Sequence, residues 1–181
     1  MIILGIDPGS RFTGYGVVEV ARGKPERLIE YGALKLDTQD DHHLRLKHIY
    51  ERITGVIERC LPDACAVEMP VYGRNPQSML KLGRAQAAAM LAALNRGIPV
   101  TEYTPKEVKK AVTGVGQASK EQVAYMIRTL LAIDADAPKV TLDASDALAV
   151  AVCHAHRLAH GAARQHKNWA DFVRSNPDRI G

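Results

Sequence analysis

The sequence contains no long apolar run, few aromatic residues and few cysteines. Aromatic residues make up 5% of its 181 residues, and only three residues are cysteine. No apolar run approaches the roughly 20 residues that span a bilayer, so we expect no membrane segment. The opening MIILGIDPGS lacks a basic segment and a cleavage site, which predicts a buried strand and no signal peptide. The odd cysteine count, without a CxxC spacing, predicts reduced, semi-buried thiols in a cytoplasmic protein.

Positive charge is concentrated in the middle of the chain. The whole sequence has a net charge of +4, but residues 72–128 alone carry 9 basic and 3 acidic side chains, a net of +6. A basic segment beside acidic ones is typical of a phosphate-binding surface near a metal site. A solvated face that keeps the protein soluble is the alternative explanation.

Apolar periodicity predicts an α/β protein with a mixed five-stranded sheet flanked by helices. Alternating or continuous apolar runs predict strands at residues 2–7, 13–20, 28–36, 64–68 and 98–103. Helical spacing and capping residues, Ser119 among them, predict helices at residues 42–60, 75–96, 104–112, 120–131 and 143–160. Short turns join the first three strands and predict an antiparallel portion, to which helical crossovers add the later strands in parallel.

The length and the apolar content of 46% suit one domain with a single core. We predict that this domain occupies residues 1–158. Apolar periodicity fades beyond it, so residues 159–181 are expected to form a flexible basic C-terminal tail.

Two acidic residues close predicted strands. Strand alternation puts Asp7 on one face with Ile3 and Gly5, at the carboxyl edge where α/β sheets hold their ligand sites. Glu68 ends the apolar run 64–68, where a buried carboxylate is costly unless it is paired or binds a metal. Each also has a structural explanation: Asp7 begins a turn sequence, and Glu68 sits at a strand end in solvent.

Asp143 and Asp146 lie three residues apart at the start of the last predicted helix. This spacing puts both carboxylates on one helix face. Helix capping is the alternative, with Asp143 as the N-cap and Asp146 as the acidic third residue of the capping pair. Taken alone, the pair favours the capping explanation.

Four carboxylates from two strand ends and one helix face would repel one another if they converged. A divalent cation removes that conflict, and Mg²⁺ prefers oxygen ligands. Two such ions about 4 Å apart stabilise the attacking and leaving oxygens of a phosphodiester. The pattern therefore indicates a metal-dependent nuclease. The pairs His42-His43 and His154/His156 lack the ligand spacing of a zinc site and are expected to be surface or helix-end histidines.

Taken together, these segments resemble the RuvC family of Holliday junction resolvases, which have the ribonuclease H-like fold. The similarity runs from residue 1 to about residue 158. The segments that carry it are residues 5–10 (GIDPGS) with 13–16 (TGYG), 67–68 (VE), 75–86 (NPQSMLKLGRAQ) and 143–149 (DASDALA), supported by 108–110 (VKK), 114–116 (GVG) and 119–123 (SKEQV).

The resemblance assigns Asp7, Glu68, Asp143 and Asp146 to catalysis and to a metal site. It implies two Mg²⁺ ions per site, with Mn²⁺ as a substitute. Lys109 and Lys120 match positions that contact DNA phosphates or support the active site. On charge alone, further candidates for DNA contact are Lys110, Arg74, Lys81 and Arg84.

One position departs from the family pattern. Three residues after the catalytic Glu, the family usually places an aromatic residue that stacks on a base at the crossover. Here that position is Val71, and the aromatic residue is its neighbour Tyr72. Either Tyr72 takes the stacking role, or this protein distorts the junction less.

The resemblance implies a homodimer that nicks the two symmetric strands of four-way junction DNA during recombination and repair. A branch-migration helicase complex is a further expected partner. The apolar helix near residues 78–96 suits a dimer seam and, equally, burial against the sheet. Alternative functions are a ribonuclease H-like nuclease with another nucleic-acid substrate and a catalytically silent junction-binding protein. Sugar kinases and actin-like ATPases share the Asp-x-Gly start, but they would require about twice this length.

Overall fold

The computed structural model describes residues 1–37, 41–70, 75–134 and 140–161, and it confirms the predicted mixed sheet. Five strands lie in the order β3-β2-β1-β4-β5. Their bounds are Ile2–Asp7 for β1, Phe12–Glu19 for β2, Arg27–Lys35 for β3, Ala64–Glu68 for β4 and Val100–Tyr103 for β5.

The antiparallel portion and the parallel additions are both present. Strand β2 pairs antiparallel with β1 and with β3, whereas β4 pairs parallel with β1 and with β5. The carboxyl ends of β1, β4 and β5 therefore meet at one edge of the sheet, which we call the carboxyl edge. This is the edge at which parallel sheets commonly place a ligand site.

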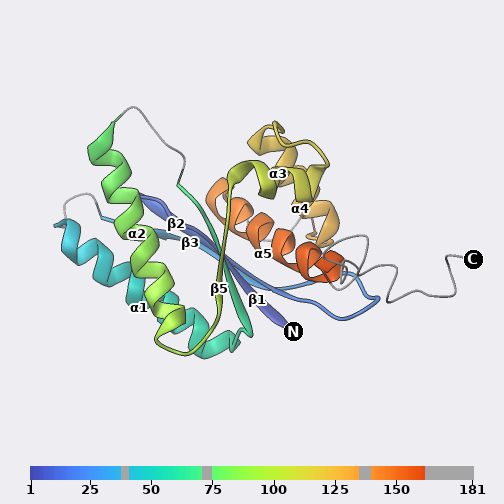
Figure 1. Cartoon of the computed structure of the whole chain (residues 1–181), viewed down its shortest axis with the longest axis horizontal. Helices are drawn as coiled ribbons and strands as arrows, with labels where there is room; N and C mark the ends of the chain where they lie inside the picture. Colours follow the sequence, from blue (N-terminus) through green and yellow to red (C-terminus); the bar gives the residue numbers. More distant parts are fainter. Residues whose placement is uncertain (38–40, 71–74, 135–139, 162–181) are drawn as a thin grey trace, which may run out of the picture.

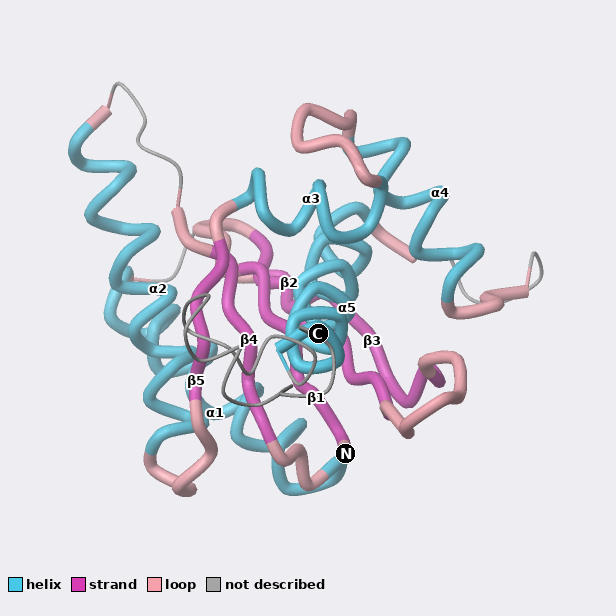
Figure 2. The backbone as a smooth tube through the Cα atoms, turned by 45° about the vertical axis from the view of Figure 1, so that its right-hand side comes forward, coloured by secondary structure: helices cyan, strands magenta, loops and turns pink. Residues whose placement is uncertain are grey.

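Five helices cover the two faces of the sheet (Figure 1). Helices α1 and α2 lie side by side on one face, while α5 lies across the middle strands on the other and is contacted by α3 and α4 (Figure 2). Their bounds are His42–Cys60 for α1, Pro76–Leu94 for α2, Pro105–Thr113 for α3, Lys120–Leu130 for α4 and Leu142–Gly161 for α5.

The core has two layers because β1 is apolar on both faces. Leu4 and Ile6 pack toward α1 and α2, and Ile3 packs toward α5, all three with 0% of their surface exposed. A strand buried on both faces reads as a continuous apolar run, as this one does. The side chain of Asp7 follows the parity of Ile3 and therefore belongs to the face that α5 covers.

Glycines let α5 lie directly on β1 and β2. A Cβ atom on Gly5 would lie 2.1 Å from the carbonyl oxygen of Ala147, and one on Gly14 would lie 1.9 Å from that of Asp143. No side chain fits in either place. Since Gly14 is also the register partner of Asp7, this close contact brings the start of α5 over the end of β1.

The element boundaries agree with the sequence prediction within about two residues at most ends. Ser119 caps α4 in a capping box with Gln122, as predicted. The second predicted helix is shorter at its end, since α2 stops at Leu94 and the chain turns through Gly97 at a φ of 69°. The three cysteines are free thiols and are buried. Within the described ranges, no helix is long and apolar enough to cross a membrane.

Candidate active site

Asp7 and Glu68 end neighbouring parallel strands and lie on the same face of the sheet. The register pairs Ile6 with Val67, so Asp7 and Glu68 follow one residue later on adjacent strands. Strand alternation directs both side chains to the face of Ala66, which belongs to the α5 side of the core. Both residues are half-buried beneath the start of α5.

Asp143 and Asp146 lie in the first turns of α5, and neither caps that helix. The hydroxyl of Thr141 accepts a hydrogen bond from the Ala144 amide at 3.3 Å, and its carbonyl accepts one from the Ser145 amide at 2.9 Å. The capping explanation for the aspartate pair is therefore wrong, because Thr141 occupies the N-cap position. Both side chains are half-buried at the end of α5 that lies over β1.

The electrostatics of Asp7 show that the carboxylates interact. Burial, together with the negative charges of Asp146 and Asp143, raises the pKa of Asp7 to about 6, while Lys120 opposes the shift. Desolvation and like charge both disfavour the ionised form. The end of β1 and the start of α5 thus form one electrostatic site.

Glu68 belongs to the same site. Burial, together with the charges of Asp7 and Asp146, raises its pKa to about 8, while Lys120 and Lys109 oppose the shift. In the metal-free protein this carboxyl therefore holds a proton at neutral pH. A cluster of titratable groups with mutually shifted pKa values at a sheet edge is typical of a functional site.

Lys120 and Lys109, the two lysines singled out by the sequence similarity, lie near these carboxylates. The Lys120 ammonium lies 2.5 Å from Asp146 Oδ2, and 13% of the Asp146 side chain is exposed. Lys120 is the first residue of α4, which the Ser119 capping box fixes in place. Lys109 on α3 is half-buried and acts on Glu68. The site therefore holds positive groups as well as negative ones.

The other candidate DNA contacts lie elsewhere. Lys110 is exposed and lines a separate cavity of about 440 Å³ with Glu107 and Arg157. Lys81 and Arg84 are exposed on α2, on the opposite face of the sheet from α5. The other positions named in the sequence analysis, Val71, Tyr72 and Arg74, fall outside the described residues.

Sequence reasoning missed a buried pair beside Glu68. Tyr103 is the register partner of Glu68, and its hydroxyl lies 2.8 Å from His154 Nδ1 on α5. Tyr103 is 1% exposed and His154 is 7% exposed, so the expectation of a surface or helix-end histidine is wrong at this position. Burial lowers the pKa of His154, and this hydrogen bond joins α5 to the strand next to Glu68. The sequence signal that could have found this pair is the alternation of side chains along β5, in which Tyr103 is the last residue.

The donor set suits a hard divalent cation. All four acidic groups offer oxygen, the preferred ligand atom of Mg²⁺. Within the described residues, no three His, Cys, Asp or Glu side chains already stand close enough together to hold a metal ion. The Lys120 ammonium provides the cation at Asp146 instead. The oxygen donors and the excess negative charge of the four carboxylates therefore suit a divalent cation. In this structure a lysine contacts one of them.

Sequence comparison identifies the family. Residues 3–154 match the family model described as crossover junction endodeoxyribonuclease RuvC. The relative of that name from Salinibacter ruber is 57% identical over 180 residues, covering 99% of each chain. The one from Porphyromonas gingivalis is 50% identical over 183 residues, covering 99% of this chain and 96% of the relative.

Structural comparison agrees. Thermus thermophilus RuvC bound to a Holliday junction substrate aligns with a TM-score of 0.82 and 37% identity, over 89% of this chain and 96% of the other. Yeast mitochondrial Ydc2, at 13% identity, aligns with a TM-score of 0.67 and shares the fold. The ribonuclease H-like fold implied by the sequence is confirmed. With a family match over most of its length and relatives this similar, the chain belongs to the RuvC family of crossover junction endodeoxyribonucleases.

Proposed function

We propose that this protein is a structure-selective endonuclease that resolves four-way DNA junctions in recombination and repair by symmetric, metal-dependent phosphodiester hydrolysis. One observation carries the proposal: in a chain of this family, Asp7, Glu68 and the α5 aspartates form one electrostatic site at the carboxyl edge, with Lys109 and Lys120 facing them. A buried acidic cluster with adjacent lysines suits a phosphodiester and a cation.

The metal ligands in this proposal are Asp7, Glu68, Asp143 and Asp146, which would hold two Mg²⁺ ions, with Mn²⁺ as a substitute. When bound, the ions lower the pKa of a water molecule and stabilise the departing 3′ oxygen. The protein contributes carboxyl groups that are largely shielded from water, since burial is the main cause of the raised pKa of Asp7 and of Glu68. Glu68, whose pKa is about 8, would give up its proton on acting as a ligand, whereas Asp7, with a pKa of about 6, is already mostly ionised at neutral pH.

The lysines orient the scissile phosphate in this proposal. With a cation held at Asp146, the Lys120 ammonium that now contacts this carboxylate would be free to donate a hydrogen bond to a phosphate oxygen. Lys109, half-buried beside Glu68, holds a second positive charge at the same edge. Lys110, Lys81, Arg84 and Arg74 remain proposed contacts to the DNA backbone.

The stacking role is proposed for Tyr72, because Val71 has no ring. Stacking of a base on an aromatic side chain contributes ~1–3 kcal/mol. Tyr72→Ala is therefore expected to lower junction cleavage about tenfold or more, and Val71→Ala much less. Wild-type cleavage by both variants would remove this role.

We also propose a homodimer, formed through α2. The helix buries its small residues Ala85, Ala89 and Ala92 within the core, whereas about half of the surface of Leu80, Leu91 and Leu94 is exposed. Leu91 and Leu94 lie in the last turns of the helix, away from Lys81 and Arg84 near its start, and form an exposed apolar ridge. An isologous dimer through this ridge would match the two-fold symmetry of a junction. A branch-migration helicase complex is a proposed partner, and the cytoplasm, where DNA and reduced thiols occur together, is the proposed location.

The test is cleavage of a mobile four-way junction with a linear duplex of the same sequence as control. We expect cutting of the junction in Mg²⁺, with none in EDTA and none by Asp146→Asn. Equal cutting of duplex and junction would contradict the resolvase function, and cutting in EDTA would contradict metal dependence. Tight junction binding by wild type without cutting in Mg²⁺ would instead identify a silent junction-binding protein.

A further inference from the structure

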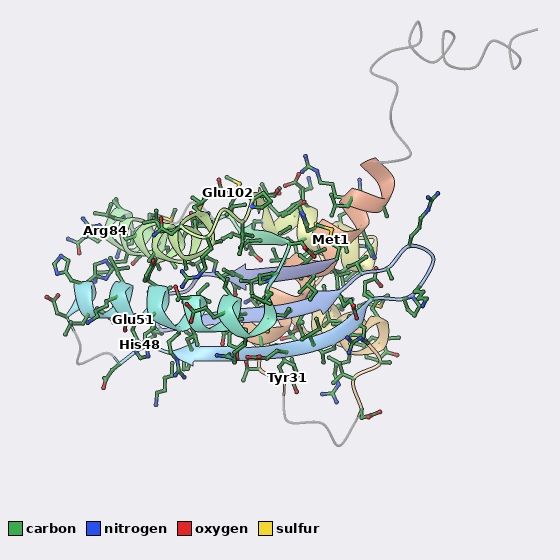
Figure 3. The ribbon with its side chains drawn as sticks, turned by 90° about the horizontal axis from the view of Figure 1, so that it is seen from below. Met1, Tyr31, His48, Glu51, Arg84 and Glu102 are labelled. Atoms are coloured by element: carbon green, nitrogen blue, oxygen red, sulfur yellow. The ribbon has the colours of Figure 1, made fainter. Side chains whose placement is uncertain are left out.

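A cluster of basic side chains lies outside the site described above. It comprises His42 and Arg45 at the start of α1 and Lys81 and Arg84 near the start of α2. Both helices begin at the carboxyl edge of the sheet, on the face opposite α5, and they lie side by side (Figure 1). Figure 3 shows Arg84 at the end of the molecule where α1 begins. We call these four residues the α1/α2 basic cluster.

The members of this cluster are close enough to repel one another. Burial lowers the pKa of His42, and the positive charges of Arg45, Arg84 and Lys81 lower it further. Like charges gathered from two separate helices destabilise the free protein. Such an arrangement is stabilised when an anion binds between them.

The cluster also has no anionic partner in the described parts of the chain. Nearby cations do: His43 pairs with Asp41 at 3.1 Å, and Lys47 pairs with Glu51 at 3.7 Å. No ion pair is found for Arg45, Lys81 or Arg84 among the described residues.

Two nitrogen atoms of the cluster are buried and have no hydrogen-bond partner among the residues that the structure describes. They are Nε2 of His42 and Nε of Arg45, both shielded from water although their residues are half-exposed. Buried polar atoms are nearly always paired in folded proteins, so these two nitrogens are available to an added acceptor. An oxyanion supplies the acceptors that these groups lack.

The positive potential of the cluster comes from its side chains and not from the start of α1. Asp41 occupies the N-cap position of that helix, and its carboxylate pairs with the His43 ring. The backbone amides of His42 and His43 also lower the pKa of Asp41, so this carboxylate offsets the helix dipole at the start of α1.

We propose that the α1/α2 basic cluster is a second phosphate-binding site, separate from the catalytic centre, that holds the DNA backbone of a junction arm. The site rests on the proposed function, since DNA is the polyanion that the carboxyl edge would receive. Lys109 and Lys120 occupy this edge on one face of the sheet, and the cluster occupies it on the other. A backbone that crosses the edge would meet positive groups on both sides.

The experiment compares two matched double variants. Lys81→Gln/Arg84→Gln removes two charges from the cluster. The control, Arg22→Gln/Lys24→Gln, removes two charges from the exposed turn between β2 and β3, at the opposite edge of the sheet. Junction affinity is measured by fluorescence anisotropy in EDTA, where no cleavage occurs, over a series of NaCl concentrations. Arg45→Gln is measured in the same way.

The expected result is a change in salt dependence. Each lost phosphate contact lowers the slope of log Kd against log salt by about 0.9, so the cluster double variant should lose about 1.8. Its affinity deficit relative to wild type should then shrink about tenfold between about 50 and 200 mM salt. We expect Arg45→Gln to lose about half as much slope, and the control to keep the wild-type slope.

If the salt-dependence slope of the cluster variant equals that of the control, the proposal is overturned. A surface that binds a protein and not DNA would give this result too. Lys81→Arg/Arg84→Lys keeps both charges and should bind as wild type does, so a loss of affinity in that variant also overturns it. The proposed function fails by a different result, namely equal cutting of junction and duplex by wild type in Mg²⁺. The salt-dependence slopes are measured without cleavage, so they still test whether the α1/α2 basic cluster binds phosphate.

Discussion

Glu68→Gln is expected to stabilise the metal-free protein at alkaline pH while it abolishes cleavage. In the folded protein, burial and then the charges of Asp7 and Asp146 raise the pKa of Glu68 to about 8, from an ordinary value of 4.5. A group whose folded pKa is raised contributes stability that is complete below its unfolded pKa. That stability is lost as the pH rises through the folded pKa. For Glu68 the loss runs from about pH 4.5 to above pH 8.

The magnitude follows from the shift. One pKa unit corresponds to about 1.4 kcal/mol, so the full shift costs wild type about 4 kcal/mol at pH 8. Water and Lys109 relax toward the ionised carboxylate, and we therefore expect the variant to gain about 2 kcal/mol. In a chain of this size that gain raises the Tm by about 4–8 °C.

The assay is thermal unfolding in EDTA at pH 5 and at pH 8. Wild type and Glu68→Gln should unfold at similar temperatures at pH 5, and the variant should unfold higher at pH 8. Glu51→Gln removes an exposed carboxylate from α1 and is the matched control, with no gain that depends on pH. Mg²⁺ should then stabilise wild type far more than Glu68→Gln, because only an intact site binds it well. A variant no more stable than wild type at pH 8 in EDTA would refute the reasoning.

Three further changes separate catalysis, helix docking and core hydrogen bonding. Lys120→Met should tighten Mn²⁺ binding about fivefold in calorimetry while it lowers cleavage, because the ammonium that competes for Asp146 is gone; weaker binding would contradict this. Gly5→Ala should destabilise the fold by about 1–3 kcal/mol by pushing α5 off the sheet, whereas Gly83→Ala, which meets nothing within 4 Å, should gain up to about 1 kcal/mol in the same denaturation series. Tyr103→Phe leaves a buried imidazole nitrogen unpaired and should cost about 1–3 kcal/mol in urea unfolding; an unchanged midpoint would show that the hydrogen bond does not contribute.

Local signals predicted the elements well. The periodicity of residues 42–60 and the apolar runs 2–7 and 64–68 gave the observed bounds of α1, β1 and β4. The Ser119 cap was also correct. These features depend on neighbours within a few residues, where propensity and hydrogen bonding act directly.

The ambiguity at the start of α5 was of another kind. Asp143 and Asp146 have the spacing of a capping pair and of a metal site alike, and the sequence could not separate the two. The structure excludes the capping role because Thr141 makes the cap, and the metal site stays a prediction. His154 shows the same limit, since a histidine near a helix end is usually exposed, and only the packing of α5 against Tyr103 buries it.

The sequence by itself determined which face of each strand carries Asp7 and Glu68, because side chains alternate along a strand. It also determined that both acids end strands that run in parallel. Only the tertiary structure decided that these carboxylates meet α5, and that Lys120, 26 residues away along the chain, rests on Asp146. The physical reason is the packing distance. The glycines of β1 and β2 let α5 come down onto the sheet, and no local pattern specifies which helix will use that space.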